Sequence, residues 1–498
     1  MPAGFCASCP LNHVSPRLRP SARIRALPCR FSCGFHVGTV PRRPGAFSRV
    51  RKVSTLAYCD RTDVGRRRAN NQDSHSVLPA SPQEYRGRGW LFLVADGMGA
   101  HAAGERASAM AAEGVPRVYE ELSEFCPPLA LKRSIEKVNT LINRKGERTV
   151  ECHGMGTTCT VLVLHPRGAI VGHVGDSRAY RVRRRTVDQL SRDHSLAWEI
   201  EAVRGGNAEE AGDTVPKNII TRSLGPHAKV DVDLEGPFPV EAGDTFILCS
   251  DGLSGVVSDA EIGLLAAELE PADAVTALIG LALVRGAPDN VTVIGVRAGD
   301  EQVSRTSRGD EAWPLSEEAT STQRQGRWAW ASLALAALGL LVALTINPWS
   351  LLTKTLCAEN DVVRTICLAT SLGGGLLAAG GGLFGTVSFL TATQRGRMLQ
   401  AGDYLGKGPY RSYDCTPTPG LVDGVVASLE AAVVALPVAA RERTVGILAR
   451  ARQHAAAEAF HEAVTAVAEA IAVHVDAIDA GRRDATGRIE PPPAPPLA

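Results

Sequence analysis

The sequence predicts a compact domain of mixed strands and helices over residues 53–298, followed by two membrane-spanning helices and a helical C-terminal region. Three observations support this division. Short apolar runs alternate with amphipathic stretches in the first half, two long uncharged runs follow, and an Ala-rich stretch of helical periodicity comes last. The 498 residues carry 54 Lys and Arg against 53 Asp and Glu, and this balance argues against a dedicated nucleic-acid binder.

The N-terminal segment differs in composition from the rest of the chain. Residues 1–50 contain eight arginines, no lysine and no acidic residue. They lack an apolar core segment, so they do not form a secretory signal. We expect residues 1–52 to be a disordered Arg-rich extension, or to lie upstream of the true start. Two alternatives stay open, namely an organellar transit peptide and a zinc site formed by Cys6, Cys9, Cys29 and Cys33.

Residues 53–298 have the pattern of one folded domain. Apolar runs predict five buried strands, at residues 90–95, 158–164, 169–174, 245–249 and 291–296. Helix-like stretches lie between them, at residues 104–124, 129–143 and 259–285. The length is ample for one large core. The polar, non-periodic residues 299–327 are expected to form a linker.

Two uncharged runs predict membrane spans. Residues 328–346 are 19 positions and residues 365–391 are 27 positions without a charged side chain. About 20 apolar residues cross a hydrocarbon core of roughly 30 Å. Trp328, Trp330 and Trp349 at the ends of the first run favour this interpretation over a buried helical hairpin.

Basic residues near the spans predict the orientation. Seven Lys and Arg residues flank the pair of runs, whereas the loop between them has only Lys354 and Arg364. Lys and Arg are enriched on the cytoplasmic side, so both large flanks are expected there. Residues 400–498 are expected to be helical, with a packing face at Phe460, Val464, Val467 and Ile471 and a Pro-rich tail.

Carboxylates at the predicted strand ends are the candidates for chemistry: Asp73, Asp96, Asp176, Asp251 and Asp289. A single Asp-Gly pair is more often a turn. Five buried carboxylates at one sheet edge would instead repel one another unless cations neutralised them. Oxygen-only ligands select hard ions such as Mg²⁺ or Mn²⁺.

Several motifs occur in an order that resembles the metal-dependent serine/threonine phosphatases of the type 2C family, bacterial branch. They are Asp-Gly-Met-Gly at 96–99 with His101 and Gly104-Glu105, Met-Gly-Thr-Thr at 155–158, Gly-Asp-Ser-Arg at 175–178, Ile-Thr-Arg-Ser-Leu-Gly at 220–225, Cys-Ser-Asp-Gly-Leu at 249–253 and Asp-Asn-Val-Thr at 289–292. The resemblance covers residues 54–298. It implies an α+β fold, a four-layer α-β-β-α sandwich of two antiparallel sheets flanked by helices.

The resemblance also implies a ligand set for two Mn²⁺ or Mg²⁺ ions and a weaker third: Asp73, Asp96, Gly97, Asp176, Asp251 and Asp289. Asp96 would bridge two ions, and Asp176 would share the third ion with Asp251. Arg68 would grip the substrate phosphate, for which its planar fork is suited. Arg68, Asp96 and Asp251 are therefore the expected catalytic residues.

The implied activity is hydrolysis of phosphoserine and phosphothreonine on proteins, by in-line attack of a metal-bridging hydroxide. The expected partners are serine/threonine kinases and their phosphorylated substrates. The protein itself is expected to be a multi-pass protein of the cell membrane, with its catalytic domain and C-terminus in the cytoplasm. A catalytically inactive membrane scaffold that binds phosphoproteins is the alternative. A small transporter or channel is disfavoured because neither span contains a charge.

Two positions depart from the family pattern. The usual Gly-Gly-His is Gly99-Ala100-His101 here, and Met98 stands where animal members have a histidine that protonates the leaving group. The general acid is therefore unassigned, with His75 and His101 as the nearest candidates in the sequence. The stretch 193–224 resembles the flap beside the family's site.

Overall fold

The computed structural model describes residues 56–78, 87–98, 103–203, 219–299, 312–315, 332, 334–341, 376, 379–380 and 398–486. The N-terminal extension, with its alternative zinc site, lies outside these residues. So does most of the two runs that are predicted to span a membrane.

Two antiparallel sheets form the centre of the molecule. The first has the order β1 (Leu56–Asp63), β11 (Val291–Ala298), β10 (Thr245–Cys249), β7 (Arg178–Arg183), β8 (Thr186–Gln189) and β14 (Arg411–Asp414). The second has the order β2 (Asp73–Leu78), β3 (Trp90–Met98), β5 (Cys159–His165), β6 (Gly168–Val174) and β9 (Asp233–Phe238), with the short β4 (Gly156–Thr157) paired to β3.

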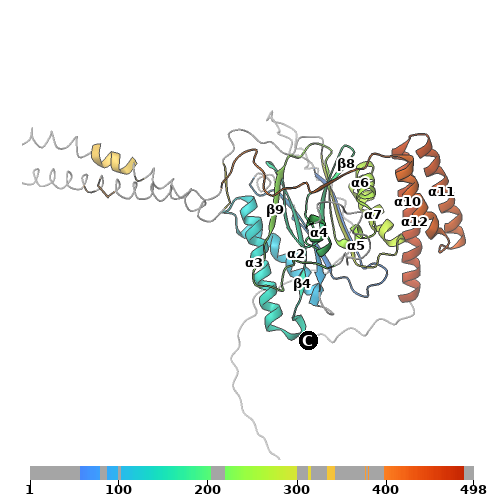
Figure 1. Cartoon of the computed structure of the whole chain (residues 1–498), viewed down its shortest axis with the longest axis horizontal. Helices are drawn as coiled ribbons and strands as arrows, with labels where there is room; N and C mark the ends of the chain where they lie inside the picture. The colour runs from blue at the N-terminus through green and yellow to red at the C-terminus, as the bar shows by residue number, and fades with distance from the viewer. Residues whose placement is uncertain are drawn as a thin grey trace, which may run out of the picture. The chain divides into compact units, whose positions relative to one another are not determined.

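Three apolar layers hold these sheets together. Phe92 and Leu162 of the second sheet meet Phe246 and Ile294 of the first in a fully buried layer between the sheets. Helices α2 (Ala103–Glu121) and α3 (Pro127–Arg148) cover the outer face of the second sheet. Helices α6 (Asp259–Glu268) and α7 (Pro271–Val284) cover the first sheet on the opposite side (Figure 1). The expected α+β sandwich of two sheets is confirmed.

All five predicted strands form, but the predicted helix at 259–285 is two helices. Pro271 lies at the start of α7, where a backbone N–H has no partner within the helix, so the missing N–H of proline costs no hydrogen bond. Leu269 and Glu270 before it are extended, with ψ of 151° and 152°. Pro disfavours helical geometry in the residue that precedes it, and this explains the break.

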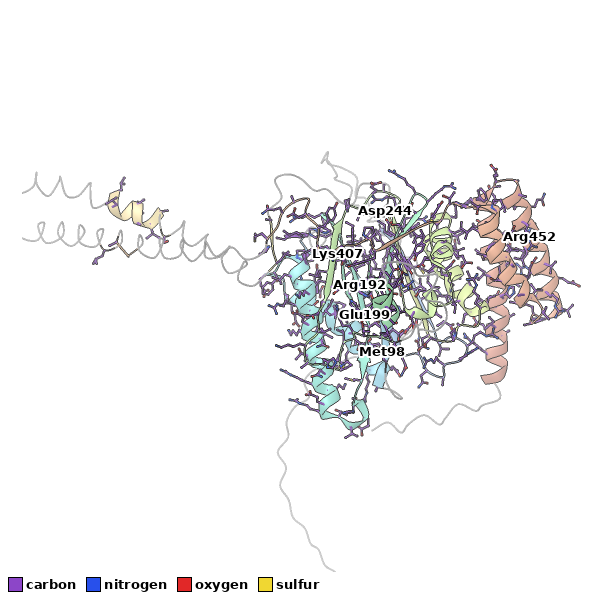
Figure 2. The ribbon with its side chains drawn as sticks, viewed as in Figure 1. Met98, Arg192, Glu199, Asp244, Lys407 and Arg452 are labelled. Carbon is purple, nitrogen blue, oxygen red and sulfur yellow. The ribbon has the colours of Figure 1, made fainter. Side chains whose placement is uncertain are left out.

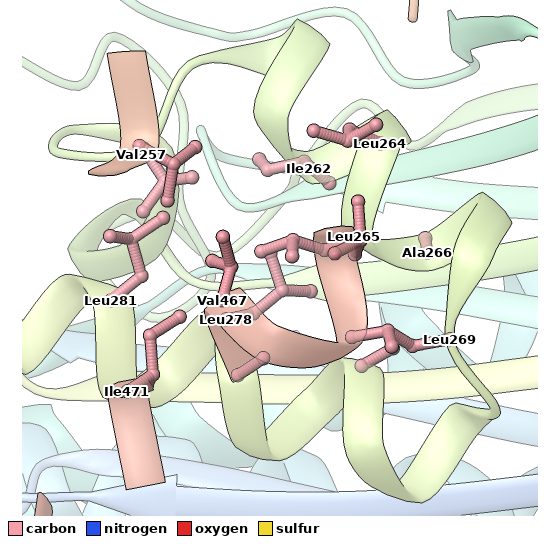
Figure 3. Packing of buried hydrophobic residues seen from close by; sticks show 14 of the residues in the cluster. Val257, Ile262, Leu264, Leu265, Ala266, Leu269, Leu278, Leu281, Val467 and Ile471 are labelled. Carbon is pink, nitrogen blue, oxygen red and sulfur yellow. The ribbon is translucent and has the colours of Figure 1, made fainter. Parts of the chain in front are cut away.

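The C-terminal helices share the core of the first sheet. Helices α10 (Pro419–Val433), α11 (Val438–Ala456) and α12 (Phe460–Thr486) belong to the same apolar cluster as α6 and α7. Leu278 and Leu281 of α7 face Val467 and Ile471 of α12 (Figure 3). A Cβ at Gly280 would lie 2.3 Å from Cγ2 of Ile471, so the two helices are in close contact.

Two segments on either side of the predicted spans pair with each other. Trp313 and Pro314 form β12, which is antiparallel to β13 (Met398–Leu399). The Trp313 ring is buried beside His165, with the Arg167 guanidinium 3.7 Å from the ring centre. Residues 312–315 were expected to be polar linker, and Trp313 instead anchors them to the apolar cluster between the second sheet and helices α2 and α3.

The described part of the first run, residues 334–341, is helical. Four of its leucines are more than half exposed: Leu335, Leu338, Leu340 and Leu341. Among the residues that the structure describes, no helix has both the length and the apolar character needed to cross a membrane.

Candidate active site

The pairing of β2 with β3 brings the first two predicted ligands together. Asp73 and Asp96 are register partners across this strand pair. Gly97 follows, and its N–H donates to the Gln72 carbonyl over 3.1 Å. A Cβ at Gly97 would lie 2.2 Å from the carbonyl oxygen of Gly104. Glycine is therefore required for α2 to approach the end of β3 this closely.

Asp73 is fixed from the other sheet through one of its two oxygens. Its Oδ2 accepts hydrogen bonds from Ser250 Oγ and Thr292 Oγ1, both at 2.7 Å. Ser250 directly precedes Asp251, and Thr292 lies three positions after Asp289. These bonds therefore join the edges of the two sheets at the site. The second oxygen, Oδ1, is buried and has no hydrogen-bond partner.

Asp251, Asp176 and Asp289 lie at the same edge. Asp251 begins the short helix α5 (Asp251–Ser254), and Asp176 follows β6. Each has one buried Oδ1 without a hydrogen-bond partner. A Cβ at Gly252 would lie 1.9 Å from the carbonyl oxygen of Asn290, so this glycine allows the Asp251 turn to rest against the Asp289 loop.

Burial and mutual repulsion raise the pKa values of the clustered carboxylates. Burial raises the pKa of Asp73 to about 7, although the hydrogen bonds from Thr292 and Ser250 act in the opposite direction. Burial, followed by the charge of Asp251, raises the pKa of Asp176 to about 7. The pKa of Asp96 is also raised, by burial and then by the charges of Asp73 and Asp251. Positive charge among these groups would restore their ionised forms.

The donor chemistry fits hard divalent cations. Three buried, unpartnered carboxylate oxygens, those of Asp73, Asp176 and Asp251, can each accept a cation at no cost in hydrogen bonds. Within the described ranges, no group of three or more Asp, Glu, His or Cys side chains is arranged so that it could hold a metal ion. The fit therefore rests on the oxygen-only donor set and on these unpaired oxygens.

Arg68 reaches the edge of the acidic cluster. Its Nη2 donates to Asp289 Oδ2 over 2.7 Å. The charges of Asp96 and Asp251 also contribute to the raised pKa of this guanidinium, after the larger effect of Asp289. The Arg68 side chain is half exposed, at 51% of its surface. It can therefore meet a phosphate that arrives from solvent.

The structure gives no general acid among the candidates that it describes. Met98, labelled in Figure 2, ends β3 and has no titratable group. His75 Nε2 lies 2.9 Å from Asp60 Oδ2, in a contact between the two sheets. The other candidate, His101, lies outside the described residues, as does Ala100. Of the stretch that resembles the flap, the structure describes residues 193–203, which include α4 (Leu196–Val203), and residues 219–224.

Sequence reasoning missed a positioning residue beside the cluster. Asn290 Oδ1 accepts from the Gln72 N–H over 2.8 Å, and its Nδ2 donates to the carbonyls of Val64 and Asn70. This one side chain therefore spans both ends of the loop that bears Arg68. Its place directly after Asp289 was the only available signal.

Comparisons with known proteins identify the family of this chain. The family model described as Protein phosphatase 2C matches residues 65–280. The serine/threonine phosphatase stp of Listeria monocytogenes is 33% identical over 250 residues, which are 49% of this chain and 97% of that protein. This chain belongs to the protein phosphatase 2C family. The protein phosphatase PhpP of Streptococcus pneumoniae is 38% identical over 248 residues, which are 48% of this chain and 96% of that relative.

Two solved structures of phosphatase 2C type are also similar to this chain. The Mycobacterium tuberculosis serine/threonine phosphatase PstP/Ppp is 34% identical, with 49% of this chain and 99% of that chain covered and a TM-score of 0.43. The PstP catalytic domain in complex with 2 manganese ions is also 34% identical, over 49% of this chain and 99% of that chain, with a TM-score of 0.41.

Proposed function

We propose that this chain is a metal-dependent phosphatase that removes phosphate from phosphoserine and phosphothreonine in proteins. The observation that carries the proposal is the convergence of three buried, unpaired carboxylate oxygens with the half-exposed Arg68 at one sheet edge. Family membership and the relatives named as serine/threonine phosphatases support it.

The acidic residues would hold the cations. Asp73, Asp96, Asp251 and Asp289 would bind two Mn²⁺ or Mg²⁺ ions together with the Gly97 carbonyl, and Asp176 would contribute to a third. Two such ions, when bound, supply an activated water and positive charge for the phosphoryl oxygens. PstP, a relative, has been solved with 2 manganese ions, which supports this choice of metal.

Arg68 would bind and orient the phosphoryl group. Its contact with Asp289 places the guanidinium at the edge of the acidic cluster. Two of its N–H groups can then donate to two phosphate oxygens. This contact would hold the phosphorus over the cluster and reduce the loss of freedom that the reaction requires.

No covalent intermediate on the protein is needed. Ser250 Oγ is buried and donates to Asp73 over 2.7 Å, while it accepts from the Thr292 N–H over 3.0 Å. Burial raises the pKa of the neighbouring Cys249 thiol to about 12, so it remains protonated. Both groups are therefore structural and not nucleophilic.

Membrane anchoring through residues 328–346 and 365–391 is part of the proposal. Leu335, Leu338 and Leu341 are exposed on the described helical segment, as a lipid-facing helix requires. The pairing of β12 with β13 supports an even number of crossings between them. The substrates would then be cytoplasmic phosphoproteins, produced by serine/threonine kinases.

A metal-dependence assay tests the enzymatic proposal against the inactive scaffold. The full chain should hydrolyse p-nitrophenyl phosphate and a phosphothreonine peptide with Mn²⁺ or Mg²⁺, and EDTA should abolish both activities. Turnover without metal would contradict the two-metal site. Phosphopeptide binding without turnover at saturating Mn²⁺ would favour the scaffold.

A further inference from the structure

The last helix of the chain reaches the loop that bears Arg68. Arg482 near the end of α12 donates from Nη1 to Asp63 Oδ2 and from Nη2 to Asp63 Oδ1, both over 3.0 Å. The same Nη2 donates to the Gly65 carbonyl over 2.7 Å. One guanidinium therefore makes three hydrogen bonds to two residues that lie 419 and 417 positions away in the sequence.

These bonds close a compact structure at the end of β1. The Gly65 N–H donates to Asp63 Oδ1 over 2.8 Å, so the Asp63 carboxylate binds both the turn and Arg482. Gly65 has a φ of +75°, and a Cβ there would lie 2.1 Å from the Asp289 carbonyl oxygen. The turn therefore rests directly on the loop of a predicted metal ligand. Arg68 follows three positions later.

The turn is held from two sides. On the inner side, Asn290 donates to the Val64 carbonyl over 2.9 Å, and the Arg66 N–H donates to the Ala287 carbonyl over 2.9 Å. On the outer side the described contact is Arg482. The two hydrogen bonds on the inner side fix the backbone of the turn at two points. The contacts of Arg482 on the outer side oppose rotation of the turn away from the acidic cluster.

Helix α12, which carries Arg482, is itself held in place by packing. Its residues Val467 and Ile471 are buried against α7, in the core of the first sheet. The Arg482 and Asp63 side chains are 33% and 22% exposed, so water screens their attraction only in part. The planar fork of arginine matches the two Asp63 oxygens, a geometry that lysine cannot provide.

We propose that Arg482 is a positioning residue for the phosphate-binding Arg68. It acts through Asp63 and Gly65 and fixes the turn that aims the Arg68 guanidinium at the acidic cluster. The affinity for the substrate phosphate would then depend on the docking of α12. This inference rests on the proposed function, because it assigns a partner to Arg68 in phosphate binding.

The test is steady-state kinetics of Arg482→Gln in the full chain, with p-nitrophenyl phosphate and saturating Mn²⁺. The KM and the inhibition constant of inorganic phosphate should each rise about threefold to tenfold, as expected for a half-shielded ion pair, while kcat changes less than twofold. For Arg482→Lys, both constants should lie between those of Arg482→Gln and those of the natural chain. An unchanged KM in Arg482→Gln overturns the proposal.

Arg452→Gln is the matched control. Arg452 on α11 (Figure 2) pairs with Glu430 at 2.9 Å through Nη2 and with Asp423 at 3.4 Å, and these partners lie on α10. The substitution removes an ion pair between the other two C-terminal helices, α10 and α11, without touching the Arg68 loop. An equal rise of KM in this control would show a general effect of helix stability, and would overturn the positioning role.

A double-mutant cycle with Arg68→Ala separates positioning from structure. If Arg482 acts through Arg68, its substitution should have no further effect on KM once Arg68 is absent. Additive effects would overturn the proposal. Should Arg482→Gln fail to fold, Asp63→Asn removes the charge but keeps an acceptor for the Gly65 N–H. Absence of metal-dependent turnover in the natural chain would instead refute the proposed function.

Discussion

Asp73 lies directly opposite Asp96 across the β2–β3 pair, so a buried and a partly exposed carboxylate face the same point from adjacent strands. In a sheet, like charges in opposite positions destabilise the pair. Ser250 and Thr292 satisfy only one oxygen of Asp73 and leave the other unpaired. This arrangement costs stability, and a cation bound in the proposed site would offset that cost by neutralising the carboxylates.

Removal of one of these carboxylates should abolish activity and stabilise the metal-free protein. Asp96→Asn relieves both burial of a charge and repulsion from Asp73 and Asp251. Without metal, we expect its thermal midpoint to rise by about 2–4 °C, which corresponds to roughly 1 kcal/mol in a domain of this size. Turnover of p-nitrophenyl phosphate should be nearly lost, and Asp251→Asn should lose it equally. The exposed Asp423→Asn on α10 is the control, with no change expected in either measurement.

Arg68→Ala should act on substrate affinity more than on turnover. Hydrogen bonds to a charged partner contribute about 1.5–3 kcal/mol, so the KM should rise about tenfold or more. The same substitution removes the partner of Asp289, so the assay requires saturating Mn²⁺. Arg68→Lys keeps the charge without the fork and should recover part of the affinity. If KM is unchanged in the alanine variant, the assignment of Arg68 to phosphate binding is wrong.

The residues of the proposed catalytic centre carry local signals in the sequence. Asp96 and Asp251 each follow an apolar strand and precede a glycine, and both glycines prove to be in close contact with neighbouring backbone. The split of the helix at Pro271 also had a local signal, since proline favours the first turn of a helix.

The helical spacing of Val464, Val467 and Ile471 predicted a packing face on α12, which is buried in the structure, but nothing local identified the partners of the C-terminal region. Nothing near Arg482 in the sequence indicates Asp63 as its partner, because only the packing of α12 on α7 brings them together. The same is true of β14, whose four residues extend the first sheet through β8. Pairing across more than 200 positions depends on the whole fold, and periodicity cannot predict it.

The packing of α12 on α7 changes what can be expected of a truncated chain. Every proposed ligand lies within residues 53–298, and on that ground the fragment alone would be soluble and active. In the structure, however, truncation would uncover Leu278 and Leu281 of α7, which are fully buried or nearly so. We expect the fragment to unfold at a lower temperature than the full chain and to aggregate, as thermal unfolding and light scattering would show.

A single substitution probes the same interface. Gly280→Leu would place a side chain where even a Cβ is 2.3 Å from Ile471, and overpacking of this kind costs about 1–3 kcal/mol. The thermal midpoint should fall by at least about 3 °C. Gly424→Ala is the matched control, because a Cβ there meets nothing within 4 Å. An unchanged midpoint in Gly280→Leu would mean that α12 is not docked on α7 in solution.

The membrane topology can be tested by cysteine labelling. The Lys- and Arg-poor loop at 347–364 should lie outside, and both flanks of the pair of spans inside. The antiparallel pairing of Trp313 with Leu399 requires the chain to return to the side from which it entered. Both observations predict that the two flanks lie on one side of the membrane, and the charge bias alone predicts that this side is the inside.

Two positions distinguish the possible outcomes in a cysteine-free background. Ser350→Cys lies in the loop and should react with an impermeant maleimide in intact cells. Gly446→Cys is the inner probe, because a Cβ at Gly446 meets nothing within 4 Å. Gly446→Cys should react only after the cells are permeabilised. Labelling of Gly446→Cys but not Ser350→Cys in intact cells would invert the topology. Labelling of neither, with the protein in the soluble fraction, would mean that residues 328–346 and 365–391 pack as a buried hairpin and that the phosphatase is not anchored by them.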